Sequence, residues 1–163
     1  TSSIWPASSG CRPPVVRSRR RRWPSYEPMS ASVAYLDTSA FVKLIVAEPE
    51  SAALEARLRR WPDRASAALL RTETIRALRR SGNGDLIGSA RRMLGAVTLI
   101  RLGEPLLDRA GDLGPAGLRS LDAIHLAAAL ALGPDLAVVV TYDDRLRDAA
   151  LAHGLAVEAP GRD

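Results

Sequence analysis

Hydrophobic and polar positions follow two alternating patterns from Val33 onward. Short apolar runs predict buried strands at 33–37, 65–67, 96–100, 136–141 and 155–158. Apolar positions with helical spacing predict helices at 39–46, 50–60, 68–80, 86–94, 104–112, 121–132 and 144–152. Short turns rich in Gly, Pro and Asp separate these segments. The alternation predicts an α/β fold in which helices cover both faces of a mostly parallel sheet.

The composition agrees with a single globular domain. The 163 residues, of which 47 % are apolar, are enough to bury a hydrophobic core. No apolar run reaches the roughly 18 residues that a membrane-spanning helix needs, and the start lacks the apolar core of a secretory signal. The single cysteine, Cys11, excludes an internal disulfide and a cysteine-based zinc site. We expect a cytoplasmic protein with no membrane partner.

The net charge of +5 resides in the N-terminal segment. Residues 1–30 contain six arginines and one acid, Glu27, and the remaining basic and acidic residues balance. Residues 1–28, with five prolines and no apolar period, predict a disordered basic arm that precedes a domain at 29–163. The arm could bind RNA or another anionic surface, or imitate a transit peptide, although its prolines disfavour an amphipathic helix. Alternatively, the natural protein begins at Met29.

Carboxylates follow two of the predicted strands. Asp37 ends the first strand in "VAYLDTSAFVKL", and Asp143 and Asp144 follow the fourth in "VVVTYDDRL". Because ligands bind at the carboxyl ends of the strands in open parallel sheets, we expect these acids to share one edge. Each could instead cap the helix that follows it, since Asp is favoured at helix N-termini. The sequence leaves both roles open.

Two predicted helices carry further acids. Asp122 opens "SLDAIHLAAALAL", a helix apolar nearly all round, with Ser120 as the predicted N-cap. A carboxylate there either needs a buried partner or complements the helix dipole. Glu73 interrupts an apolar stripe in "ALLRTETIRALRR", unless it forms an exposed pair with Arg76 or intrahelical contacts near Arg80. His125 predicts a packed or hydrogen-bonded core histidine, because no second histidine lies at metal-ligand spacing.

Acids from four parts of the chain cannot gather unpaired, because repulsion and desolvation would protonate some of them. No matching set of Lys or Arg is interleaved among them. Mg²⁺ or Mn²⁺ would supply the missing charge, since carboxylates and waters are the ligands that these ions prefer. One or two such ions would activate water for in-line displacement at phosphorus. The pattern therefore favours a nuclease or a phosphatase, and spacing does not choose between them.

Other chemistries lack their residues. The turn "SGNGD" is not followed by Lys-Ser or Lys-Thr, as a phosphate-binding loop requires. No "GxSxG" nucleophile elbow occurs in the sequence. Ser39 occupies the position where an aspartyl-phosphate phosphatase would carry its second acid after Asp37.

Four segments together resemble a known family. "YLDTSAFVKL", "RTETIRALRR", "LRSLDAIHLAAAL" and "VVVTYDDRLRDAALAHGL" are similar, in order and spacing, to the motifs of PIN-domain ribonucleases, above all VapC-type toxins of bacterial toxin–antitoxin pairs. The resemblance covers about 33–157. It implies a three-layer α/β/α fold and Mg²⁺- or Mn²⁺-dependent cleavage of RNA, often tRNA or ribosomal RNA. It also implies a homodimer and a cognate antitoxin that inserts a segment into the active-site groove.

The resemblance assigns roles by position. It implies four catalytic, metal-holding acids: Asp37, Glu73, Asp122 and Asp143. It implies supporting residues beside them: Thr38, Ser39, Arg119, Thr141 and Asp144. The hydroxyl residues would orient a carboxylate or a metal-bound water, and Arg119 could contact phosphate. Asp144 competes with Asp143 for the fourth place.

Two other functions remain open from the residues themselves. The same metal site could hydrolyse another phosphoester, such as DNA. Alternatively, the chain could be a non-catalytic regulator that binds nucleic acid or an antitoxin, with the acids serving as helix caps and ion pairs. Outside residues 1–30 the chain is neutral, so only a local patch such as Arg76, Arg79 and Arg80 would attract nucleic acid, unless it merely complements a helix dipole. Binding of Mn²⁺ distinguishes these functions.

Overall fold

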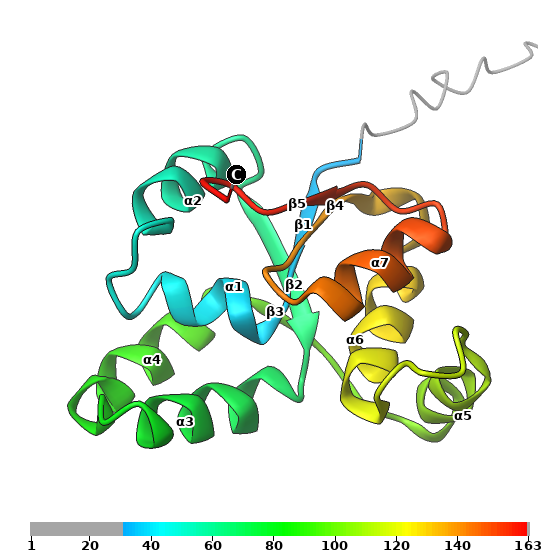
Figure 1. Ribbon diagram of the computed structural model, residues 1–163, viewed down its shortest axis with the longest axis horizontal. Coiled ribbons are helices and arrows are strands. Elements are labelled where there is room, and N and C mark those ends of the chain that lie inside the picture. Colours follow the sequence, from blue (N-terminus) through cyan, green and yellow to red (C-terminus); the bar gives the residue numbers. More distant parts are fainter. Residues whose placement is uncertain (1–30, 163) are drawn as a thin grey trace, which may run out of the picture.

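Five parallel strands form the central sheet of the computed structural model, which describes residues 31–162 (Figure 1). The strands are β1 (Val33–Leu36), β2 (Asp63–Ala67), β3 (Thr98–Ile100), β4 (Leu136–Val140) and β5 (Val157–Glu158). They lie in the order β3-β2-β1-β4-β5, and every neighbouring pair is parallel. The chain therefore winds outward from β1 in both directions, and the carboxyl ends of β1 and β4 flank the switch point where such sheets bind ligands.

Helices cover both faces of this sheet. They are α1 (Thr38–Lys43), α2 (Ser51–Leu58), α3 (Leu70–Arg80), α4 (Ile87–Leu94), α5 (Glu104–Asp112), α6 (Ser120–Ala131) and α7 (Asp144–Ala152), with short 3₁₀ turns η1 (Gly84–Leu86) and η2 (Gly133–Asp135). Figure 1 shows α1 to α4 on one side of the sheet and α5 to α7 on the other. The three-layer α/β/α prediction is confirmed, and element ends differ from prediction by a few residues. The predicted arm at 1–28 lies outside the described residues.

The core follows from the two-residue period of the central strands. Ala34 and Leu36 of β1 share a buried cluster with Phe41 of α1. Tyr35 points to the opposite face, where it shares a cluster with Ala128 of α6. Successive side chains of a strand face opposite sides of the sheet, so a strand covered on both faces is apolar throughout.

Helix α6 is the most deeply buried helix in the part of the chain described. Its buried residues are Ala123, His125, Leu126, Ala127, Ala128 and Ala129. The alanines let the helix approach the sheet closely, and they explain why its sequence is apolar nearly all round. None of the helices within residues 31–162 combines the length and apolarity needed to cross a membrane.

Leu54 on α2 is fully buried, whereas Leu151 on α7 is 53 % exposed. We expect Leu54→Ala to lower the free energy of unfolding by about 2–5 kcal/mol, because it leaves a cavity in the core. Leu151→Ala should change it by less than about 0.5 kcal/mol, because water already covers this side chain. Urea unfolding followed by circular dichroism measures both values. Equal losses in the two variants would contradict the packing described for α2.

Candidate active site

A cleft of about 870 Å³ opens at the carboxyl ends of β1 and β4, and we call it the acidic cleft. Residues of α1, α3, the start of α6 and the turn between β4 and α7 line it. All four predicted acids are among them: Asp37, Glu73, Asp122 and Asp143. The structure thus brings together carboxylates that lie up to about a hundred residues apart in the sequence. Thr38, Ser39 and Arg119 also line this cleft.

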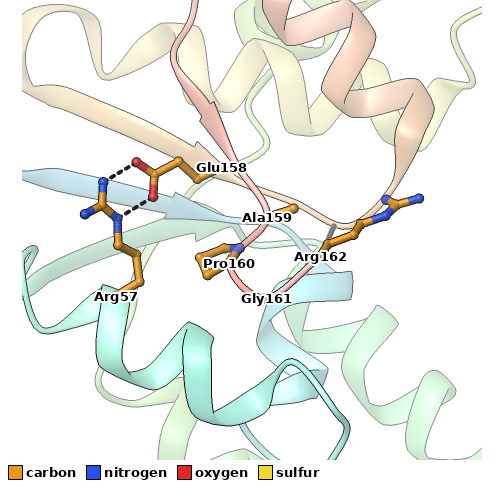
Figure 2. A pocket seen from close by; sticks show the side chains of 6 residues that line it. All are labelled: Arg57, Glu158, Ala159, Pro160, Gly161 and Arg162. Carbon is orange, nitrogen blue, oxygen red and sulfur yellow. Dashed lines mark hydrogen bonds and ion pairs between the residues drawn. The ribbon is translucent and has the colours of Figure 1, made fainter.

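A smaller cavity of about 440 Å³ lies between α2 and the C-terminal residues (Figure 2). The guanidinium of Arg57 donates two hydrogen bonds of 2.6 Å to Glu158. Arg162 donates to the backbone oxygen of Tyr142 and to the carboxylate of Asp144. The charged side chains among the described residues that line this cavity are therefore already paired within the chain. The acidic cleft is therefore the candidate active site.

Asp37 is the most buried of the four acids, with 5 % of its surface exposed. It is the N-cap of α1, where its Oδ1 accepts hydrogen bonds from the Ala40 amide at 2.9 Å and the Ser39 hydroxyl at 2.7 Å. Its Oδ2 accepts a hydrogen bond of 2.8 Å from Thr141, which is fully buried behind the cleft. Burial raises the pKa of Asp37, and these hydrogen bonds oppose the rise only in part. Asp37 therefore both caps a helix and faces the cleft.

Glu73 projects from α3 and is held through one oxygen. Its Oε2 accepts hydrogen bonds from the hydroxyl of Thr38 and, at 2.8 Å, from Nε2 of His125. Desolvation raises the pKa of Glu73, but the hydrogen bonds from His125 and Thr38 outweigh it, so the pKa lies below its ordinary value. Within residues 31–162 no ion pair joins Glu73 to Arg76, so the predicted pair with Arg76 is wrong. The charge of Arg80 helps to lower the pKa of Glu73, as the alternative of contacts near Arg80 would have it.

Asp122, near the start of α6, and Asp143, the N-cap of α7, both line the cleft, and their charges interact. Burial, and then the charge of Asp143, raise the pKa of Asp122, while Arg119 opposes the rise. The Oδ2 atom of Asp122 is buried and accepts no hydrogen bond from any described residue. Asp143 is the N-cap of α7, where its Oδ1 accepts hydrogen bonds from the amides of Arg145 and Leu146. An unpaired buried oxygen beside a second carboxylate is a feature that a cation would stabilise.

Asp144 lies outside the acidic cleft, although it follows Asp143 directly. Its carboxylate pairs with Arg147 at 2.7 Å and with Arg162 at 3.0 Å, and its side chain is 55 % exposed. The hydrogen bond from Arg162 lowers the pKa of Asp144. The structure therefore separates the two neighbours, and only Asp143 shares the cleft with the other acids.

Basic residues line the cleft on two sides. Arg76 and Arg80 belong to α3, and Arg119 precedes α6. The predicted N-cap at Ser120 is wrong, because α6 begins at that residue and Arg119 occupies the cap position without a side-chain cap hydrogen bond. The charge of Arg119 opposes the rise in the pKa of Asp122 that burial causes.

The prediction that His125 is a hydrogen-bonded core histidine is confirmed, but the residue also reaches the cleft. It is 4 % exposed, and its two ring nitrogens lie 2.8 Å from the Tyr35 hydroxyl and from Glu73. Sequence reasoning missed Tyr35, which reads as one more apolar residue of a strand. It also missed Tyr142, which lines the cleft below the ammonium of Lys43.

The raised pKa of Asp37 means that the folded chain binds this proton more tightly than the unfolded chain. Below the unfolded pKa the carboxyl is neutral in both states, and stability falls as the pH rises through the folded pKa. We expect Asp37→Asn to unfold at higher urea concentration than the parent at pH 7 in EDTA, and the difference to shrink as the pH falls. Asp148→Asn, at an exposed position on α7, is the control. A less stable Asp37→Asn variant at pH 7 would contradict the burial cost.

Comparison with known proteins agrees with this arrangement. Residues 34–151 match the family described as PIN domain. The chain is 52 % identical over 126 residues to Ribonuclease VapC46 of Mycobacterium tuberculosis, covering 77 % of this chain and 96 % of that protein. It is 40 % identical over 131 residues to Ribonuclease VapC47 of the same species, covering 78 % and 96 %.

Two solved structures share the fold. One is VapC20 of Mycobacterium tuberculosis, described as a Sarcin-Ricin loop cleaving toxin, with a TM-score of 0.60, 18 % identity, and coverage of 78 % of this chain and 99 % of that one. The other is VapBC2 of Rickettsia felis bound to a DNA fragment from its promoter, with a TM-score of 0.59, 17 % identity, and coverage of 77 % and 97 %. The sheet order, the domain match and the identity to its relatives together show that this chain belongs to the PIN-domain family, among the VapC ribonucleases.

Proposed function

We propose that this VapC ribonuclease is the toxin of a type II toxin–antitoxin pair and cuts RNA in the acidic cleft with the help of Mg²⁺ or Mn²⁺. Asp37, Glu73, Asp122 and Asp143 would be its catalytic acids. The observation that carries the proposal is their convergence in one cleft from four separate segments of the chain. Asp144 would have no catalytic role, because arginines pair with it outside the cleft.

The residues of the cleft fit a divalent cation. The buried, unpaired Oδ2 of Asp122 and the raised pKa values of Asp37 and Asp122 indicate negative charge that the chain leaves uncompensated. Within residues 31–162, no three His, Cys, Asp or Glu side chains are close enough to form a ready cage. The acids would therefore hold the ion partly through water, as suits Mg²⁺, which keeps several of its waters. When bound, such an ion lowers the pKa of a coordinated water and offsets phosphate charge.

The chain's own residues would place the RNA against these acids. Arg76 and Arg80 on α3 and Arg119 before α6 would bind backbone phosphates on two sides of the scissile bond. Asp37 would keep its position because its oxygens accept hydrogen bonds from α1 and from Thr141 after β4. Rigid placement of charged groups before the reaction is a large part of such catalysis.

The partners of this chain are part of the same proposal. The solved relative VapC20 cleaves the Sarcin-Ricin loop, and VapBC2 was solved with promoter DNA. By similarity we propose a tRNA or ribosomal RNA substrate for this chain, a cognate antitoxin that occupies the acidic cleft, and a homodimer. These partners would meet in the cytoplasm.

The test is cleavage of total bacterial RNA by the purified full chain in Mn²⁺, in Mg²⁺ and in EDTA. We expect discrete fragments that EDTA abolishes. Asp37→Asn and Asp143→Asn should each reduce the cleavage rate by about 10²-fold or more, which is typical for the loss of a group that stabilises a charged transition state. A parallel incubation with single- and double-stranded DNA tests the alternative substrate.

The matched control is Asp144→Asn, which changes the neighbouring carboxylate outside the cleft. It should retain most of the cleavage that Asp143→Asn loses. A loss in Asp144→Asn with normal cleavage by Asp143→Asn would reverse the assignment of the fourth acid. The absence of cleavage under every metal condition, together with no Mn²⁺ binding by calorimetry, would instead favour the non-catalytic regulator.

A further inference from the structure

A buried chain of hydrogen bonds runs from the sheet to the acidic cleft. The Ala67 amide of β2 donates to the Tyr35 hydroxyl of β1 at 3.0 Å. That hydroxyl lies 2.8 Å from Nδ1 of His125 on α6, and Nε2 of the same ring lies 2.8 Å from Oε2 of Glu73 on α3. Tyr35 is fully buried and His125 is 4 % exposed. The chain thus joins four elements and ends on a proposed catalytic acid.

The hydrogen bonds impose a direction on this chain. The Tyr35 oxygen already accepts the Ala67 amide proton, so its own proton is free to be donated to Nδ1 of His125. Nδ1 is then the acceptor nitrogen of the ring, and Nε2 carries the proton. This tautomer donates to Glu73, whereas the other tautomer would turn a lone pair toward the carboxylate.

The result is a Glu73 carboxylate that is held through a single oxygen. Oε2 accepts hydrogen bonds from His125 on one side and from Thr38 on the other. Oε1 accepts no hydrogen bond from a side chain of the described residues, and Glu73 lines the cleft. Two donors on one oxygen fix the plane of the carboxylate and leave the second oxygen for a ligand.

We propose that Tyr35 and His125 are positioning residues that orient Glu73 for ion binding in the acidic cleft. The inference rests on the proposed function and adds two residues to it. Each acts through Glu73 and not as a ligand of the ion itself. Hydrogen-bond partners of metal ligands typically fix the orientation of those ligands in this way.

Core packing alone does not account for the arrangement. His125 is the one polar residue among the buried positions of α6, where the others are alanine or leucine. Burying its two polar nitrogens costs free energy unless both find partners, and an apolar side chain would avoid that cost. A histidine that served only the core could end its hydrogen bonds on backbone groups, whereas this one ends on an acid of the cleft.

The experiment measures Mn²⁺ binding to the full chain by isothermal titration calorimetry, without RNA. Tyr35→Phe keeps the ring and removes the hydroxyl, and His125→Leu removes both ring nitrogens. Each should weaken Mn²⁺ binding by roughly 10–100-fold, the usual effect of losing a partner of a metal ligand. His125→Gln, which retains an amide donor for Glu73, should lose less than His125→Leu.

A double variant tests whether Tyr35 acts through His125. Adding Tyr35→Phe to His125→Leu should weaken Mn²⁺ binding no further, because residues in one network are not additive. RNA cleavage by the single variants should show a lower kcat with little change in KM, since the substrate contacts are intact. Additive losses of Mn²⁺ affinity in the double variant would overturn the inference that Tyr35 acts on Glu73 through His125.

Two controls separate positioning from stability. Leu54→Ala lowers stability in the core at α2, where Leu54 does not line the acidic cleft, and should keep the parental Mn²⁺ affinity. His153→Gln changes a histidine whose Nδ1 lies 2.9 Å from a backbone oxygen of its own helix, and should also keep it. Unfolding of every variant is followed by circular dichroism.

The outcomes distinguish this inference from the proposed function. If the parent chain binds Mn²⁺, and Tyr35→Phe and His125→Leu bind it with the same affinity, the positioning role of Tyr35 and His125 is overturned and the proposed function stands. The same conclusion follows if every variant, Leu54→Ala included, loses Mn²⁺ affinity in proportion to its loss of stability. No Mn²⁺ binding and no RNA cleavage by the parent chain would overturn both proposals.

Discussion

The buried carboxylate of Asp37 is the constraint on which the acidic cleft depends. It lies where β1 ends and α1 begins, and its oxygens accept hydrogen bonds from Ala40 and from Thr141 after β4. The Ser39 hydroxyl donates to the same carboxylate and accepts from the amide of Tyr142. The ends of β1 and β4 are therefore tied together through one side chain. Moving it would displace both walls of the switch point at once.

The same aspartate can cap a helix and line the acidic cleft. Asp37 and Asp143 each cap a helix through Oδ1, and both still line the cleft. A cap holds its carboxylate at a strand end with little freedom, which is the property that a preorganised site needs. Burial raises the pKa of Asp37, so keeping this carboxylate ionised lowers the stability of the folded chain. Functional sites commonly impose such a cost in stability.

Charge is balanced outside the cleft more fully than inside it. Outside it, Arg57 pairs with Glu158 at 2.6 Å, and Asp144 pairs with Arg147 and Arg162. Inside the cleft, by contrast, Asp122 has a buried oxygen without a hydrogen-bond partner among the described residues. Unbalanced carboxylates confined to one place favour a cation there, whereas dispersed unpaired acids would indicate only a solvated surface.

Local pattern was sufficient to predict the elements and most of the candidate site. Strands such as 136–141 and the apolar helix at 121–132 were recognisable because burial and backbone hydrogen bonding impose a period on neighbouring residues. The acids at strand ends were recognisable because the edge of a parallel sheet follows from strand order along the chain. The family resemblance added Glu73, which periodicity alone left undecided between cleft and surface.

Contacts between distant residues were beyond any local pattern. Tyr35 lies 90 residues from His125, and His125 lies 52 residues from Glu73, so no spacing in the sequence predicts their hydrogen bonds. Asp143 and Asp144 are neighbours with the same chemistry, and they differ because Arg162 folds back from the C-terminus onto one of them. Side-chain partners depend on how helices pack across the sheet, and that packing brings together groups that the chain order keeps apart.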